Sequence, residues 1–169
     1  MLSFTALVIA LSCTLGTQTT AMAADARERE LIGVWQDISF MASGWSDTYQ
    51  FFGDGTYVFN HSQMNCLKRE IWHSGSWKIQ GRHLRLTIAN RKVIVGGKRG
   101  EDPVCGPTII GGRGVTKNVN PPEVTTVYMG VIQYEMDDHP LASRQEMPSV
   151  KIGSTKYWRL HQDPKQYGP

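Results

Sequence analysis

Hydrophobic and polar residues alternate along most of the chain from Gly33 onward. A period of two is typical of β-strands that bury one face and expose the other. Glycine, aspartate and proline interrupt the pattern at short intervals, which divides it into about eight strands. The pattern therefore predicts an all-β domain. An antiparallel up-and-down barrel is favoured over a sandwich, because closure leaves no unpaired strand edge.

Two hairpins are predicted in the first half of the chain. Residues 49–52 and 56–59 are rich in aromatic and β-branched side chains and flank Gly53-Asp54-Gly55, and Asp-Gly is a strong hairpin signal. Residues 69–79 and 82–88 form a second pair around Gln80-Gly81. The expected partners in the second hairpin are Trp77–Leu84, Gly75–Leu86 and His73–Ile88, on one apolar face.

The rest of the chain predicts a helix, further strands and one long loop. Residues 24–32 suggest a short entry helix, and residues 91–95, 124–136, 150–152 and 156–161 suggest strands. The segment 96–114 holds seven glycines and two prolines, and we expect it to be a long loop.

The N-terminus has the features of an export signal. Residues 1–23 carry no charged side chain and contain an apolar block that ends near Leu11. Ala21-Met22-Ala23 fits the cleavage rule for signal peptidase, so the sequence predicts a signal peptide at 1–23 and one domain at 24–169. The apolar block is too short to span a bilayer, and we expect no transmembrane helix in the mature chain. Localisation in the periplasm or secretion follows, with a lipoprotein modified at Cys13 as the alternative.

The two cysteines of the mature chain are expected to pair. Cys66 and Cys105 are an even number in an exported protein, for which a disulfide bond is the usual outcome. Two free buried thiols are the alternative. The formal net charge of +3 comes from scattered side chains without a basic run, so no nucleic-acid partner is expected.

Several short motifs resemble a known family. Gly33-Val34-Trp35 directly follows the expected helix. Next come Phe51-Phe52-Gly53-Asp54-Gly55-Thr56-Tyr57, Gly75-Ser76-Trp77, Gly81 and Leu84, and Tyr157-Trp158-Arg159-Leu160 lies near the end. In this order they resemble bacterial exported lipocalin-like (calycin-type) small β-barrels. The resemblance implies a structural lock of Gly33, Trp35 and Arg159, with the arginine packed across the tryptophan. It also implies a tendency to bind small apolar or amphipathic molecules.

The sequence contains no recognisable catalytic signature. The five histidines lack short metal-ligand spacings such as H-x₃₋₅-H, and His73 and His83 are expected on opposite faces of their hairpin. Neither cysteine has a neighbouring histidine, and there is no G-x-S-x-G motif. We therefore expect a protein that is not an enzyme and has no metal site and no cofactor.

Four residues are candidates for ligand binding. Trp72 falls on the polar face of its strand, where a large aromatic side chain often marks a binding surface. His73 shares the buried face with Trp77, while Tyr128 and Tyr134 lie together on one face of the strand at 124–136. The sequence thus favours a periplasmic or secreted binding protein for a small apolar or amphipathic ligand. The alternative is a partner-protein module, of the protease- or lysozyme-inhibitor type, acting through the 96–114 loop.

Overall fold

The computed structural model describes residues 26–40, 44–137, 139–142 and 144–167. The predicted signal peptide at 1–23 and Cys13 lie outside these residues. A short helix covers residues 26–31, and none of the described helices is long and apolar enough to cross a membrane. The strands in the described chain are β1 (Gly33–Gln36), β2 (Thr48–Phe51), β3 (Thr56–Asn60), β4 (Glu70–Gln80), β5 (His83–Asp102), β6 (Gly106–Tyr128), β7 (Gln133–Met136), β8 (Glu146–Ile152) and β9 (Thr155–His161), before the 3₁₀ helix η1 (Pro164–Gln166).

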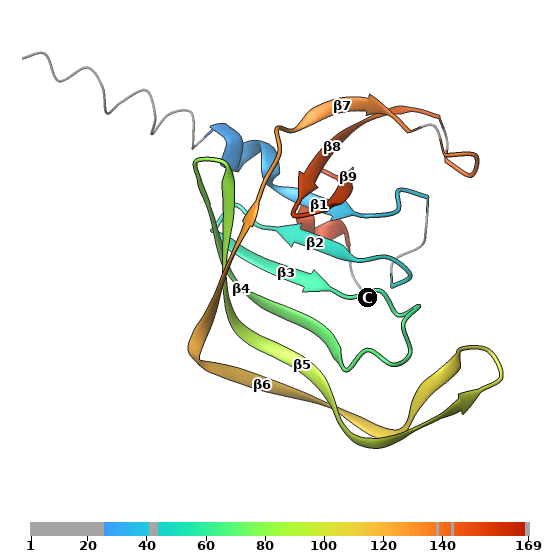
Figure 1. Ribbon diagram of the computed structural model, residues 1–169. Coiled ribbons are helices and arrows are strands. Elements are labelled where there is room, and N and C mark those ends of the chain that lie inside the picture. The colour runs from blue at the N-terminus through green and yellow to red at the C-terminus, as the bar shows by residue number, and fades with distance from the viewer. Residues whose placement is uncertain (1–25, 41–43, 138, 143, 168–169) are drawn as a thin grey trace, which may run out of the picture.

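The predicted all-β class is confirmed, but the sheet is not a closed barrel. All nine strands belong to one antiparallel sheet in the order β6-β5-β4-β3-β2-β1-β9-β8-β7. This is an up-and-down order with a seam between β6 and β7, which form the two edges of a strongly curved sheet (Figure 1).

The end of β6 reaches the other end of the sheet at β8, next to the edge strand β7. There Met129 forms an isolated bridge with Ile152, and the Gly153 amide donates to the Tyr128 carbonyl at 2.8 Å. The predicted single strand over 124–136 is therefore wrong: β6 ends at Tyr128, and the chain crosses the seam before β7 begins. Among the described strands β6 and β7 do not form a ladder, which leaves the sheet open.

The hairpin around Gly53-Asp54-Gly55 is confirmed as β2 and β3. Phe51 pairs with Tyr57, and the turn is stabilised by Asp54 Oδ1, which accepts from the Thr56 amide at 2.9 Å. The last predicted pair of strands is confirmed as β8 and β9, joined at Gly153.

The β4–β5 hairpin is confirmed, but its predicted register is wrong by two residues. The observed pairs are Ile79–Leu84, Trp77–Leu86, Gly75–Ile88 and His73–Arg91, in place of Trp77–Leu84, Gly75–Leu86 and His73–Ile88. The turn consists of Gly81 and Arg82, with Gly81 at a φ of +59° that favours glycine. A slip of two residues keeps every side chain on its face, so the hydrophobic pattern did not distinguish the two registers.

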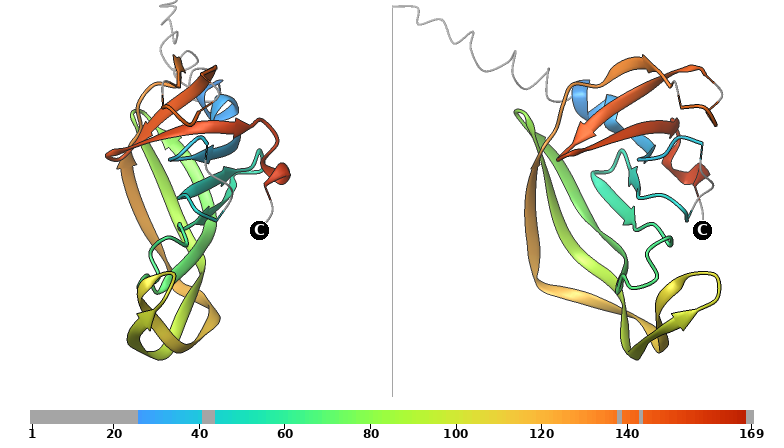
Figure 2. Two further views of the ribbon diagram at one scale, coloured as in Figure 1. Left: turned by 90° about the vertical axis from the view of Figure 1, so that its right-hand side faces the viewer. Right: turned by 45° about the vertical axis from the view of Figure 1, so that its right-hand side comes forward.

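The expected 96–114 loop is instead a two-stranded ribbon. β5 continues to Asp102 and β6 starts at Gly106, so the glycine-rich segment pairs along most of its length and projects beyond the neighbouring strands (Figure 2). Glycine is required at Gly97, where φ is +71° and a Cβ would lie 2.7 Å from the Gly112 backbone nitrogen. The predicted Cys66–Cys105 disulfide is present and connects the tip of the ribbon to the β3–β4 loop.

The core lies on the inner face of the curved sheet and is largely aromatic. Its largest fully buried side chains include Trp35, Phe51 and Tyr57. The contact expected between Trp35 and Arg159 is present, with the guanidinium carbon 5.5 Å from the ring centroid.

Candidate functional site

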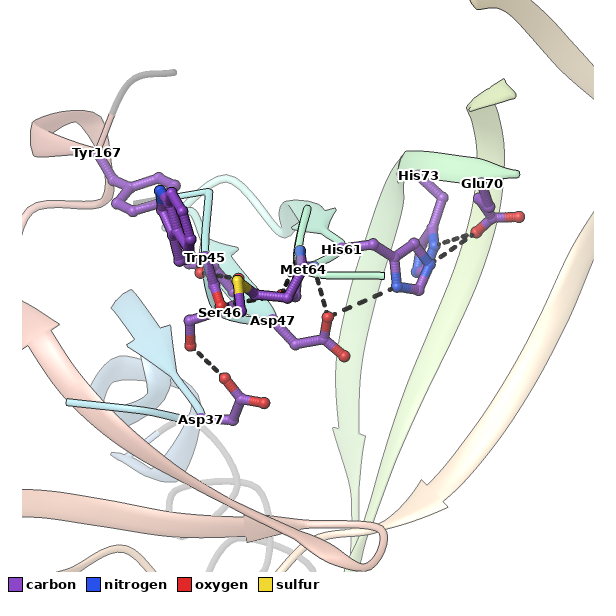
Figure 3. Close-up of polar contacts among 11 residues, drawn as sticks. Asp37, Trp45, Ser46, Asp47, His61, Met64, Glu70, His73 and Tyr167 are labelled. Atoms are coloured by element: carbon purple, nitrogen blue, oxygen red, sulfur yellow. Dashed lines mark hydrogen bonds and ion pairs between the residues drawn. The ribbon is translucent and has the colours of Figure 1, made fainter. Parts of the chain in front are cut away.

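Two imidazoles and one carboxylate form a polar cluster at one end of the aromatic core. His61 follows β3, Glu70 opens β4, and His73 lies opposite Phe59 in the β3–β4 ladder. Their side chains converge in Figure 3. His61, Glu70 and His73 keep side-chain exposures of 15%, 25% and 12%, so the cluster remains accessible from solvent.

Two irregularities in the β4–β5 ladder determine which side chains join this cluster. Glu70 pairs with Val93 and Trp72 with Lys92, which leaves Ile71 without a partner. The extra residue places Glu70 on the same face as His73, whereas simple alternation would place it beside Trp72. β-Bulges of this kind redirect side chains and are enriched near functional sites.

A second irregularity does the same for Arg91. Gly75 pairs with Ile88 and Ser74 with Asn90, so Ala89 is the extra residue on β5. Arg91 then lies opposite His73 on the inner face. The two bulges together place the Glu70 carboxylate and the Arg91 guanidinium on the inner face. Strict alternation would place both on the outer face.

The three central residues converge on one oxygen atom. Glu70 Oε1 is 2.8 Å from His73 Nδ1 and 3.4 Å from His61 Nε2. One ligand atom from each residue can be chosen so that all lie within 4.8 Å of one another. Two histidines and a glutamate at this spacing offer the donor atoms of a metal site.

Charged neighbours hold the cluster from both sides. Arg91 Nη1 lies 3.3 Å from Glu70 Oε2, and Arg91 Nη2 donates to Glu123 Oε2 at 2.6 Å. On the other side Asp47 Oδ1 lies 3.8 Å from His61 Nδ1 and accepts from the Ser62 amide at 2.7 Å.

These surroundings change the protonation of the cluster. Burial alone raises the pKa of Glu70, but hydrogen bonds from His73 and His61 and the charge of Arg91 outweigh it, so the pKa is lowered. Burial lowers the pKa of His73, and together with the charges of His61 and Arg91 it outweighs the opposing effect of Glu70. Near neutral pH the cluster therefore pairs an ionised carboxylate with a neutral imidazole at His73.

Three buried polar atoms at the cluster have no hydrogen-bond partner within the described part of the chain. They are Tyr57 Oη, His61 Nδ1 and Arg91 Nε. A buried polar group without a partner is costly, and native proteins usually satisfy it with water or a ligand. The cluster thus retains unused hydrogen-bonding capacity in a partly buried position.

A cavity lies on the outer face of β2, β3 and β4, opposite the inner face that carries the polar cluster. It has a volume of about 580 Å³, and its lining alternates with the core residues along β2, β3 and β4. The cavity is lined by Gly44, Gln50, Val58, Asn60, His61, Gln63, Ile71, Trp72, Ser74, Lys92 and Tyr167. This size is within the range of small-molecule sites.

The C-terminal segment forms one wall of this cavity. Gln50 Nε2 donates to the carbonyls of Pro164 and Tyr167, each at 2.9 Å. The Tyr167 hydroxyl accepts from the Gly44 amide at 3.1 Å, which ties η1 to the β1–β2 connection. Segments distant in the sequence therefore build the cavity together.

The structure does not bring the four predicted ligand residues into one site. Trp72 lines the cavity, and His73 belongs to the polar cluster on the other face of the sheet. Tyr128 and Tyr134 are largely exposed elsewhere; Tyr128 lies beneath Arg82, and Tyr134 accepts a hydrogen bond from Arg159 at 3.5 Å.

Sequence reasoning missed His61, Glu70 and Asp47 as members of a site. A signal was available for His61, because it lies two residues beyond Phe59 and so shares the inner face. Glu70 had no such signal, since its position depends on the bulge at Ile71.

Comparison of the chain with protein-family models, curated protein sequences and solved structures finds no match.

Proposed function

We propose that this protein binds a small amphipathic molecule with an acidic group in the cavity beside Trp72. The observation that supports the proposal most directly is the 580 Å³ cavity with aromatic walls at Trp72 and Tyr167. Protein sites for small molecules are mostly apolar concave surfaces with a few placed polar groups. The protein acts in this proposal as a carrier or sensor rather than as an enzyme.

The lining residues divide the cavity by chemistry. Val58, Ile71 and Trp72 provide the apolar surface for a hydrocarbon or ring system. Lys92 adds a positive charge to the cavity lining. It has no ion-pair partner among the described residues. A carboxylate or sulfonate on the ligand would provide that partner, while its apolar part is removed from water.

The proposal includes export of the protein to the periplasm or the outside of the cell. The Cys66–Cys105 disulfide supports this location, because such bonds persist in oxidising compartments. A lipocalin-like ligand site would lie inside a barrel. The cavity here lies on the outer face of an open sheet, so the proposal rests on the cavity itself and not on the resemblance.

A binding titration with a defined probe tests the proposal. We expect dodecanoate to bind the purified full chain in isothermal titration calorimetry. Trp72→Ala and Lys92→Gln should each weaken binding at least fivefold, and Ser74→Phe should block it by filling the cavity. Tyr134→Ala, an exposed aromatic outside the cavity, is the matched control. Absence of binding, or equal affinity in all four variants, would refute the site.

One observation supports a second candidate function, recognition of a partner protein by the β5–β6 ribbon. Val104 at the tip is 95% exposed and Ile110 is 56% exposed, and β6 is an edge strand. Exposed apolar side chains on an unpaired edge are suited to a protein partner. Inhibition assays against a lysozyme and trypsin, with the Val104→Asp/Ile110→Asp double variant for comparison, test this alternative. It fails if neither enzyme is inhibited or if the variant inhibits equally.

A further inference from the structure

We propose that His61, Glu70 and His73 bind a divalent first-row transition metal ion of the zinc class. This cluster lies on the inner face of the sheet, whereas the amphipathic cavity lies on the outer face. His61 contacts both. The metal site does not depend on the proposed function.

The spacing of the candidate ligand atoms fits such an ion. Zinc–nitrogen and zinc–oxygen bonds of roughly 2.0–2.1 Å in a tetrahedron place neighbouring ligand atoms about 3.3 Å apart. Glu70 Oε1 is already 3.4 Å from His61 Nε2 and 2.8 Å from His73 Nδ1. All three candidate ligand atoms lie within 4.8 Å of one another, so they must approach by at most about 1.5 Å to reach the tetrahedral spacing.

The residues around the cluster match the needs of a metal site. A histidine that binds a metal through one nitrogen usually donates from the other to a carboxylate, a backbone carbonyl or water. If His61 binds through Nε2, its Nδ1 faces Asp47 Oδ1 at 3.8 Å, and that nitrogen has no hydrogen-bond partner among the described residues. Arg91 contacts Glu70 Oε2 and so leaves Oε1 for the ion.

The cluster also has a route for entry and room for a further ligand. A hollow of about 230 Å³ is lined by His61, Glu70 and the β3–β4 loop that carries Cys66. Three protein ligands leave at least one coordination position open in a four-coordinate site. The hollow is large enough for water or a small anion at that position.

The donor set determines which ions fit. Two imidazoles with one carboxylate suit zinc, iron, nickel or copper ions. Calcium and magnesium prefer sites made of oxygen ligands. We therefore expect binding of Zn²⁺ and no measurable binding of Ca²⁺ or Mg²⁺.

Calorimetric titration of the tag-free full chain, first dialysed against a chelator and then against buffer, tests the site with Zn²⁺. We expect one ion per chain. Glu70→Gln, which keeps the shape of the side chain, His61→Gln and His73→Gln should each weaken binding at least tenfold. His83→Gln and His161→Gln, two exposed histidines outside the cluster, should leave the affinity unchanged.

A measurement on the wild-type protein tests the site even if some variants fail to fold. In NMR spectra, Zn²⁺ should shift the imidazole resonances of His61 and His73 and leave those of His83 in place. The proposal is overturned if Zn²⁺ does not bind, or if the control histidines account for binding and Glu70→Gln does not weaken it. The Zn²⁺ titration does not depend on whether dodecanoate binds, so the two proposals can fail separately.

Discussion

The guanidinium of Arg159 in β9 lies over the indole of Trp35 in β1, and the two residues are also direct partners in the β1–β9 ladder. Trp35 is fully buried and donates from Nε1 to the Leu31 carbonyl at 2.7 Å. Arg159 also donates to the Glu30 carbonyl at 3.1 Å. The pair thus joins the short helix to the β1–β9 ladder, which connects the two halves of the sheet order.

Removing this arginine should destabilise the fold. We expect Arg159→Ala to lower the free energy of unfolding by about 1–2 kcal/mol, because the cation–π contact and the hydrogen bonds to Glu30 and Tyr134 are lost. Urea denaturation followed by tryptophan fluorescence measures the change. Arg159→Lys keeps the charge and should lose less. Equal stability of the wild type and Arg159→Ala would show that the contact contributes nothing.

The disulfide should be a major source of stability. Cys66 and Cys105 are 39 residues apart, and the bond therefore restricts a long loop in the unfolded chain. On the chain-entropy model, the Cys66→Ser/Cys105→Ser double variant should lose about 3–4 kcal/mol. Thermal unfolding of the variant and of the oxidised wild type checks this value. A wild type reduced with dithiothreitol serves as the matched control and should behave like the variant.

Gly75 should not tolerate any side chain. A Cβ at this position would lie 1.8 Å from the Thr87 carbonyl oxygen, because the bulge at Ala89 brings the two backbones close together. We expect Gly75→Ala to cost more than about 2 kcal/mol in the free energy of unfolding. Gly53→Ala is the control, since its Cβ would meet only Ile32 Cδ1 at 3.4 Å. Similar unfolding midpoints for the two variants in urea would contradict the close approach.

Alternation of side chains accounts for the part of the fold that was predictable from the sequence. It located β2, β3, β8 and β9, and it placed His73 on the inner face with Trp77. It did not determine the β4–β5 register, because a slip of two residues preserves alternation. It also failed in the segment 96–114, where glycines that suggested a loop allow two close strands to pair.

The polar cluster was harder to predict, because it depends on pairing between strands and not on alternation along one strand. His61 and His73 are twelve residues apart and become neighbours only through the β3–β4 ladder. Glu70 and Arg91 join them because single extra residues at Ile71 and Ala89 reverse the alternation locally. A bulge depends on contacts between strands, and a pattern along one strand does not contain that information.

The pH dependence of stability at the β2–β3 turn follows from Asp54. The Thr56 hydroxyl and amide both donate to its carboxylate, and these bonds lower its pKa below the ordinary value of 3.8. Because the folded pKa lies below the unfolded one, the carboxylate stabilises the fold above the unfolded pKa. This contribution is lost as the pH falls through the folded pKa.

We therefore expect Asp54→Ala to be less stable than the wild type at about pH 6, with a difference that shrinks toward about pH 2.5. Urea denaturation at both pH values measures the difference. Asp54→Asn keeps an acceptor oxygen but does not titrate, so the same comparison with Asp54→Asn isolates the charge. Glu101→Ala, with its exposed carboxylate on the ribbon, controls for the general effect of removing an acidic group. A gap between the wild type and Asp54→Ala that stays constant from neutral to acidic pH would show that the ionised turn contributes no stability.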